Sequence, residues 1–211
     1  GLVDGTTYTL IPSILDAQTG QPAPFDQGYG LEIPGIGENF TQSWSHNFGS
    51  ITDPILSANI TIGIFDHDSA ASGSQLSVFD LDGNDFTSTL DDLFETPGEG
   101  NDGEYNVYTV EISPSALSSL EDGTLTVQLN LAGPALITPL FPLPGPNPPE
   151  EVEFNGAHLI FSTLEITTQD TQPPAVIPEP ATMTIWSLFA GLGLVGRARR
   201  RKKECRRFHV L

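Results

Sequence analysis

Strict alternation of apolar and polar side chains is the feature that most limits how this chain folds. In TLTVQLNL, residues 124–131, every second residue is apolar and the residues between are polar. Successive side chains of a β-strand point to opposite faces, so this pattern predicts a strand with one face on a core and one in water. The segment LSANITIGIF, residues 56–65, repeats the pattern and places on one face Leu56, Ala58, Ile60, Ile62 and Ile64.

Other segments extend this all-β reading. Strong strand candidates are residues 105–112 and residues 158–167, the latter after an Asn155-Gly156 turn, and weaker ones are residues 8–15, 43–48 and 75–79. Asp-Gly and Pro-Gly pairs separate these runs and mark turns. A single short helix is expected at residues 114–120, capped by Ser113 with proline at its first position. Many short strands separated by such turns predict an antiparallel β-sandwich, jelly-roll or immunoglobulin-like, over residues 1–167.

The charges divide the chain into two parts. All eight basic residues lie after Gly196, and of the 27 acidic residues only Glu204 does, so residues 1–196 carry 26 acids and no lysine or arginine. A surface of this kind repels nucleic acid, and we expect no nucleic-acid partner. The only cysteine, Cys205, also lies in the basic end, so no disulfide braces the body.

Two proline-rich stretches lie outside the predicted sheets. Residues 133–149 predict a long polyproline-like loop, since prolines do not fit a central strand. Residues 168–177 predict a polar, proline-containing linker that leaves the domain.

The apolar stretch at residues 181–196 contains Gly191-Leu-Gly193-Leu-Val-Gly196, which formally matches a dinucleotide-binding fingerprint. That fingerprint needs a second strand with an acidic residue about 20 positions later, and the chain is too short for it. As a helix the stretch would be about 24 Å long. A cluster of basic residues follows it and would stay on the cytoplasmic side of a membrane: Arg197, Arg199, Arg200, Arg201, Lys202 and Lys203. These features predict a single transmembrane helix at residues 181–196, with the body outside the cytoplasm and a basic tail at residues 204–211.

Residues 178–203 also resemble a known signal. Pro178-Glu179-Pro180, a short apolar helix and an arginine-rich end occur in the order found in the PEP-CTERM sorting signal of exported bacterial proteins. The resemblance implies recognition in the inner membrane by an exosortase, cleavage near the motif, and delivery of the body to the cell surface or the extracellular matrix. The two prolines keep the motif extended and accessible. A plain, uncleaved membrane anchor is the alternative.

Acidic loops at predicted strand ends raise the question of a metal. Asp66-His67-Asp68 follows one strand, and Asp80-Leu-Asp82-Gly-Asn-Asp85 follows another. Oxygen-rich loops of this kind suit calcium, which takes six to eight oxygen ligands. The second loop does not fit an EF-hand, because its glycine stands at the fourth position, and a solvated Asp-Gly hairpin turn is the alternative. The predicted calcium ligands are Asp66, Asp68, Asp80, Asp82 and Asp85.

Three classes of function remain for the body. The catalytic motifs with a Gly-x-Ser-x-Gly elbow or a His-Glu-x-x-His pair do not occur in the sequence, and we expect no enzyme and no cofactor other than calcium. A structural protein of the cell surface or matrix is the leading hypothesis. The alternative is a calcium-dependent carbohydrate-binding or adhesion module, for which Trp44, together with Tyr29 and Tyr105, is nominated as an aromatic contact to polysaccharide. His46 shares a predicted face with Trp44 and Phe48, which favours a half-buried structural histidine.

Overall fold

The computed structural model describes residues 1–8, 12–95, 100–138 and 148–169. Gly1–Asp170 form one compact unit. Its secondary structure, in chain order, is β1 Thr6–Thr7, α1 Pro12–Gln18, β2 Gly28–Tyr29, β3 Thr41–Asn47, β4 Ile55–Phe65, β5 Leu76–Leu81, β6 Asn84–Asp85, α2 Thr87–Phe94, β7 Glu104–Glu111, the 3₁₀ helix η1 Leu117–Asp122, β8 Thr124–Leu131, β9 Ala135–Ile137, β10 Glu150–Val152 and β11 Ala157–Thr168. The expected antiparallel sheets are confirmed, and the described residues are mostly β with few helices.

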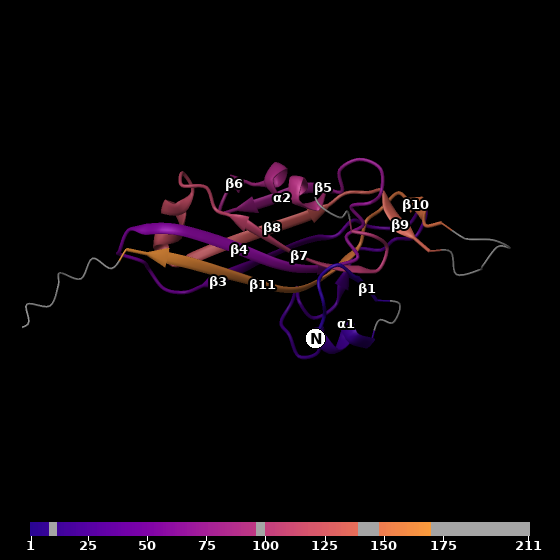
Figure 1. The fold of residues 1–211 in the computed structure, drawn as a ribbon, viewed down its shortest axis with the longest axis horizontal. Coiled ribbons are helices and arrows are strands. Elements are labelled where there is room, and N and C mark those ends of the chain that lie inside the picture. Colours follow the sequence, from indigo (N-terminus) through magenta and orange to yellow (C-terminus); the bar gives the residue numbers. More distant parts are fainter. Residues whose placement is uncertain (9–11, 96–99, 139–147, 170–211) are drawn as a thin grey trace, which may run out of the picture. The chain divides into compact units, whose positions relative to one another are not determined.

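The strands form two main sheets and one small ribbon. The larger sheet has the order β1-β7-β4-β11-β2, the second has the order β3-β8-β5-β6, and β9 pairs with β10. Every pairing is antiparallel. Figure 1 shows β5 and β8 lying over β4 and β7, with α1 on the opposite side of the larger sheet.

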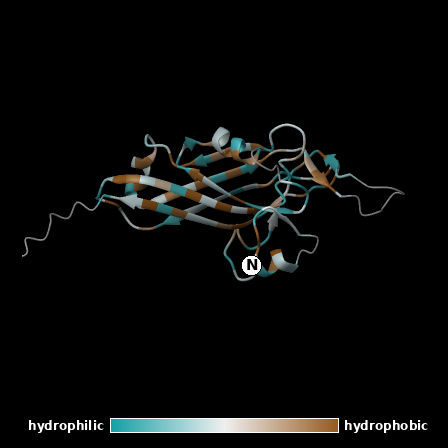
Figure 2. Cartoon of the chain, viewed as in Figure 1, coloured by the Kyte–Doolittle hydropathy of each residue, from teal (hydrophilic) through white to brown (hydrophobic). Residues whose placement is uncertain are grey.

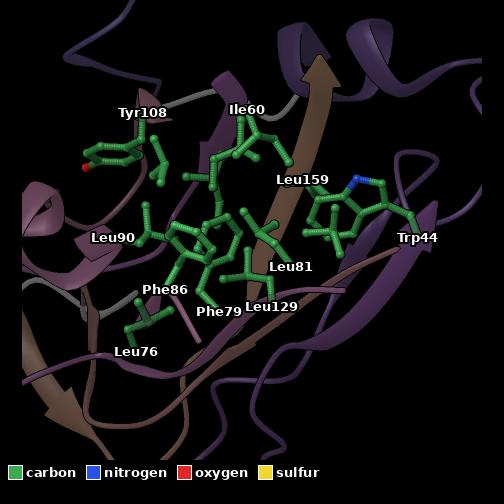
Figure 3. Close-up of a cluster of buried hydrophobic side chains, with 14 of the residues drawn as sticks. Trp44, Ile60, Leu76, Phe79, Leu81, Phe86, Leu90, Tyr108, Leu129 and Leu159 are labelled. Carbon is green, nitrogen blue, oxygen red and sulfur yellow. The ribbon is translucent and has the colours of Figure 1, made fainter. Parts of the chain in front are cut away.

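One hydrophobic cluster joins the two main sheets. It includes Ile60 and Ile62 of β4 and Phe79, Val127 and Leu129 of the second sheet. Figure 3 shows Ile60, Phe79 and Leu129 of this cluster between the strands, and Figure 2 shows alternating apolar and polar bands along the strands. The alternation predicted for residues 124–131 is confirmed, because its four apolar side chains are buried.

The prediction that Leu56 lies on the buried face of β4 is wrong. Leu56 is 58% exposed, while Ala58 is buried as expected. The pairing of β4 with β11 shifts register at this end, where Thr167 pairs with Ser57 and Thr168 pairs with Ile55. The resulting bulge leaves Leu56 without a partner residue and breaks the alternation.

Helices occur where the sequence suggested none. Residues 8–15 were expected to form a strand, but Pro12–Gln18 form α1, which buries Ile14 and Gln18 four residues apart. Proline suits the first position of a helix, and a spacing of four places two side chains on one helix face. Thr87–Phe94 form α2 and bury Leu90 and Phe94 with the same spacing. The helix expected at residues 114–120 is instead a 3₁₀ helix that begins at Leu117.

The predicted loop at residues 133–149 is only partly a loop. Ala135–Ile137 form β9, which pairs with Glu150–Val152 of β10. The prolines responsible for the prediction lie around these short strands and in residues 139–147, outside the described part. The described residues contain no helix long and apolar enough to span a membrane, and the predicted span at residues 181–196 lies outside them.

Candidate functional site

Four acidic side chains gather at one end of the larger sheet. They are Glu32, Asp66, Asp68 and Asp102, and together they are called the carboxylate cluster below. The charges of the three aspartates all act on Glu32, and Asp66 and Asp102 both act on Asp68. The sequence prediction contained two of these residues, Asp66 and Asp68, and missed the other two.

The order of the strands explains why these residues meet. Phe65, the last residue of β4, pairs with Tyr105 near the start of β7 and with His158 near the start of β11. Antiparallel neighbours run in opposite directions, so the end of β4 lies beside the beginnings of β7 and β11. The segment after β4 carries Asp66 and Asp68, and the turn before β7 carries Asp102. Contacts distant in sequence therefore build the cluster.

Each carboxylate has one oxygen held by a donor from another segment. The acceptor and donor pairs are Glu32 Oε1 with the Gly156 N–H at 2.9 Å, Asp66 Oδ1 with the Gly103 N–H at 2.5 Å, Asp68 Oδ2 with the Leu136 N–H at 2.8 Å, and Asp102 Oδ2 with the Thr138 hydroxyl. These bonds fix the direction of each carboxylate. They also tie the β9 segment to the segment after β4, and the residue before β11 to the segment after β2.

Among the described residues, no lysine or arginine balances the cluster, because none occurs before Arg197. Burial, followed by the charges of Asp66 and Asp68, raises the pKa of Glu32 to about 9. Burial also raises the pKa of Asp68, and the charge of Asp66 adds to this effect. The pKa of Asp66 is raised by burial too, although the Gly103 N–H opposes the shift. The isolated cluster therefore favours taking up positive charge, as protons or as a cation.

Two buried oxygen atoms beside the cluster have no hydrogen-bond partner among the described residues: Asp68 Oδ1 and Asn155 Oδ1. Both side chains are fully buried. The Asn155 amide donates to the carbonyl oxygen of His67, the residue before Asp68, at 2.8 Å. Two buried, unpartnered acceptors thus lie on adjoining segments.

His67 holds the Asp66–Asp68 segment in the core. Its ring is fully buried and stacks on Phe94 at 4.3 Å between centroids. Its Nε2 lies 2.8 Å from the Tyr108 hydroxyl and 3.2 Å from Asn106 Oδ1. Burial lowers the pKa of His67 to about 4, so the ring is neutral at neutral pH. The aspartates on either side adopt left-handed backbone conformations, with φ of 65° at Asp66 and 55° at Asp68.

A polar pocket of about 320 Å³ opens beside the cluster. Side chains of Glu32, Asp66 and His158 line it, together with the backbone of the neighbouring β2 and β11 segments. Gly30 brings these segments together: it has a φ of +84°, and an added Cβ would lie 2.7 Å from the Gly156 Cα. The pocket gives solvent a route to Glu32 and Asp66.

The second predicted acidic loop lies elsewhere. Asp82-Gly83 forms the turn between β5 and β6, with both residues at positive φ, as a two-residue hairpin requires. Its carboxylates accept main-chain N–H groups: Asp80 from Gly83 at 2.6 Å, Asp82 from Thr126 at 2.7 Å and Asp85 from Thr87 at 2.9 Å. Figure 1 shows β6 at the other end of the body from β9, which contacts Asp68. The structure therefore does not bring the two predicted groups of calcium ligands together.

Trp44 does not present its ring to a ligand. Only 8% of its surface is exposed, and its ring packs edge-on against Phe25 at 5.8 Å. Figure 3 shows it beside Leu159 in the core. Of the other nominated aromatics, Tyr105 is also buried, and Tyr29 is half-buried in the pocket wall. His46 is half-buried as expected, with its Nε2 2.9 Å from the Ser162 hydroxyl.

The predicted sorting residues Pro178, Glu179 and Pro180 and the basic residues 197–203 lie outside the described residues. A comparison with protein-family models finds one match there: residues 176–202 match the model described as a PEP-CTERM protein-sorting motif. Neither a curated protein nor a solved structure matches the chain. The match covers the sorting segment and leaves the body to be interpreted from its own structure.

Proposed function

We propose that the chain, whose residues 176–202 match the PEP-CTERM protein-sorting motif, is sorted by an exosortase to the cell surface, and that its body is a non-catalytic structural component of the surface or extracellular matrix. The sorting motif is the observation that carries the proposal. In the precursor, residues 181–196 span the inner membrane, and the basic residues 197–203 hold the C-terminal end in the cytoplasm. Cleavage near Pro178-Glu179-Pro180 then releases the body.

The fixed positions of the histidines support a non-catalytic body. His67 lies in the core, His46 contacts Ser162, and the His158 Nδ1 lies 2.9 Å from Gln18 Oε1. Burial lowers the pKa of all three rings. A histidine that serves as a general base needs access to substrate, which the fully buried His67 ring lacks.

The architecture suits a structural role. Two sheets that share one core are typical of a β-sandwich, and the choice between a jelly-roll and an immunoglobulin-like topology stays a prediction. The acidic surface keeps copies of the body apart in low salt, whereas divalent cations in a matrix would bring them together.

A calcium-dependent carbohydrate-binding or adhesion module is the second candidate. The carboxylate cluster and its pocket favour the cation part of this hypothesis. The burial of Trp44 removes the aromatic contact that the sequence suggested for polysaccharide.

Replacing Pro178, Glu179 and Pro180 with alanine in the native host tests the sorting proposal. We expect the full-length chain to accumulate in the inner-membrane fraction, as measured by immunoblotting after fractionation. The matched control replaces Pro173 and Pro174, two prolines before the motif, and should be processed normally. Normal processing of the triple variant would contradict the proposal.

A further inference from the structure

The carboxylate cluster is built from three segments of the chain, and the described residues offer it no lysine or arginine. Glu32 comes from the segment after β2, Asp66 and Asp68 from the segment after β4, and Asp102 from the turn before β7. Carboxylates brought together in this way repel each other unless a positive charge is shared among them. The fold nevertheless holds them there with donors from Gly103, Leu136, Thr138 and Gly156.

Unpartnered oxygens give the second, independent indication of a ligand. Asp68 Oδ1 and Asn155 Oδ1 are buried acceptors that no described donor satisfies. Buried polar atoms in native proteins almost always have a partner, and each exception calls for an explanation such as a bound ion. Both atoms are acceptors, so the missing partner is a donor or a cation. Of these two kinds of partner, only a cation also balances the negative charge of the cluster.

The donor set indicates the kind of cation. The described residues contain no group of three or more His, Cys, Asp or Glu side chains that could hold a metal by themselves. Sites for zinc and similar metals use such groups almost exclusively. Calcium differs, because it accepts amide and main-chain carbonyl oxygens and water alongside a few carboxylates. The two unpartnered acceptors, a carboxylate oxygen of Asp68 and the amide oxygen of Asn155, are of the kinds that calcium accepts.

We propose that a calcium ion binds at the end of β4, held by the carboxylates of Asp66 and Asp68 and the amide oxygen of Asn155. Glu32 and Asp102 flank the ion and add to the negative potential. Water molecules complete its shell from the pocket on the Glu32 side, which is the route of entry. Because the ion joins the segment after β4 to the segment before β11, it stabilises this end of the body. The site is independent of the sorting motif and adds a ligand to the proposed structural role.

Protons are the competing occupant. A protonated Asp68 would relieve the repulsion, but its hydroxyl would need an acceptor, and Asn155 Oδ1 is the nearest unpartnered candidate on the adjoining segment. The two occupants differ in a measurable way, since calcium binding is specific for the ion and releases protons, whereas protonation requires no metal.

Isothermal titration calorimetry with calcium chloride on the full chain, purified in a non-ionic detergent and stripped with EDTA, tests the proposal. We expect one calcium per chain, much weaker binding of magnesium, and a heat that depends on the buffer because protons are released. Asp68→Asn should abolish the binding. Glu32→Gln, in a half-buried flanking group, should weaken it about tenfold to 100-fold while leaving the fold intact. Asp16→Asn removes one charge from the exposed part of α1 and serves as the control that binds like the unchanged chain.

Two results would overturn the proposal. One is the absence of a saturable calcium heat in a chain whose circular dichroism shows a folded β structure. The other is calcium binding that Glu32→Gln and Asp68→Asn weaken no more than Asp16→Asn does, which would indicate diffuse screening of an acidic surface.

Discussion

Two aspartate-rich loops that look alike in the sequence have different structures. Asp66-His-Asp68 follows β4, and the loop from Asp80 to Asp85 joins β5 to β6. In the second loop, Asp80 and Asp85 bond to main-chain N–H groups two or three residues away, which is ordinary turn chemistry. In the first loop, the donors lie 37 and 68 residues away, and Asp68 is fully buried.

This difference teaches that local composition does not decide what an acidic loop does. In the hairpin loop, Asp80 and Asp85 accept nearby N–H groups, whereas Asp82 accepts the distant Thr126 N–H and its other oxygen is buried without a partner among the described residues. The loop after β4 is enclosed by β7, β9 and β11 and gains further acids from segments distant in sequence. Substitutions of the same kind in the two loops should therefore have unlike effects.

The largest contrast should come from the residue that anchors each loop. His67→Ala removes a buried ring from its stack on Phe94 and should lower the free energy of unfolding by about 3 kcal/mol. Asn84→Ala in the hairpin loop removes the amide bonds to the Leu81 and Asp82 carbonyls, 3.0 and 3.4 Å long, and should cost about 1 kcal/mol. Urea denaturation followed by circular dichroism measures both. Equal losses would show that His67 does not anchor its loop.

Stability without calcium should fall as the pH rises from 7 to 9. The raised pKa values of Glu32, about 9, and Asp68, about 8, mean that the folded chain binds protons more tightly than the unfolded chain, so stability is lost as the pH rises through these folded values. Asp66, with a pKa raised to about 6, contributes its loss below this range. Asp102 faces these three groups and adds to their repulsion. Histidines contribute little above about pH 6.5, where they are neutral in both states.

The loss over this range should be about 2 kcal/mol, measured by urea denaturation in EDTA. Glu32→Gln should flatten the profile, and Asp80→Asn should leave its slope unchanged. A profile that is flat in the unchanged chain would rule out the buried repulsion.

Removal of a single charge should stabilise the chain in the loop after β4 and leave its stability almost unchanged in the hairpin loop. In EDTA at pH 9, Asp68→Asn removes a buried charge while keeping an oxygen for the Leu136 N–H, and it should stabilise the chain by about 1–2 kcal/mol. Asp80→Asn keeps the oxygen that accepts the Gly83 N–H, and its effect should stay within about 0.5 kcal/mol. Thermal melts compare the two variants, and destabilisation by Asp68→Asn under these conditions would contradict the account.

The smallest effect concerns the turn itself. Gly83 has a φ of +78° and open space where a Cβ would stand, so Gly83→Ala introduces backbone strain without a clash. We expect a loss of about 1 kcal/mol in a urea titration, unchanged by calcium. A loss that calcium reverses would place a cation at the hairpin loop.

The sequence predicted much of the fold because periodicity is a local signal. Residues 124–131 alternate strictly, and β8 occupies those residues. The helices α1 and α2 were missed because each is only two turns long and signals itself by one buried pair four residues apart. Leu56 was placed wrongly because a bulge depends on the partner strand, which periodicity does not reveal.

The candidate site could be predicted only in part for the same reason. Asp66 and Asp68 were selected because they follow a clear strand. Glu32 and Asp102 carry no local signal, since their proximity to Asp66 depends on β4 lying between β7 and β11. Asn155 was read as part of a turn, and only the packing shows that its side chain is buried with an unpartnered oxygen.

The most direct test of the central claim is a thermal melt of the full chain in calcium chloride and in sodium chloride at matched ionic strength. It should be run on the unchanged chain, Asp68→Asn and Asp80→Asn. If calcium binds at the end of β4, the melting temperature should rise in calcium but not in sodium, and this rise should be kept in Asp80→Asn and lost in Asp68→Asn. Equal shifts in the two salts, or a rise lost in Asp80→Asn instead, would contradict it.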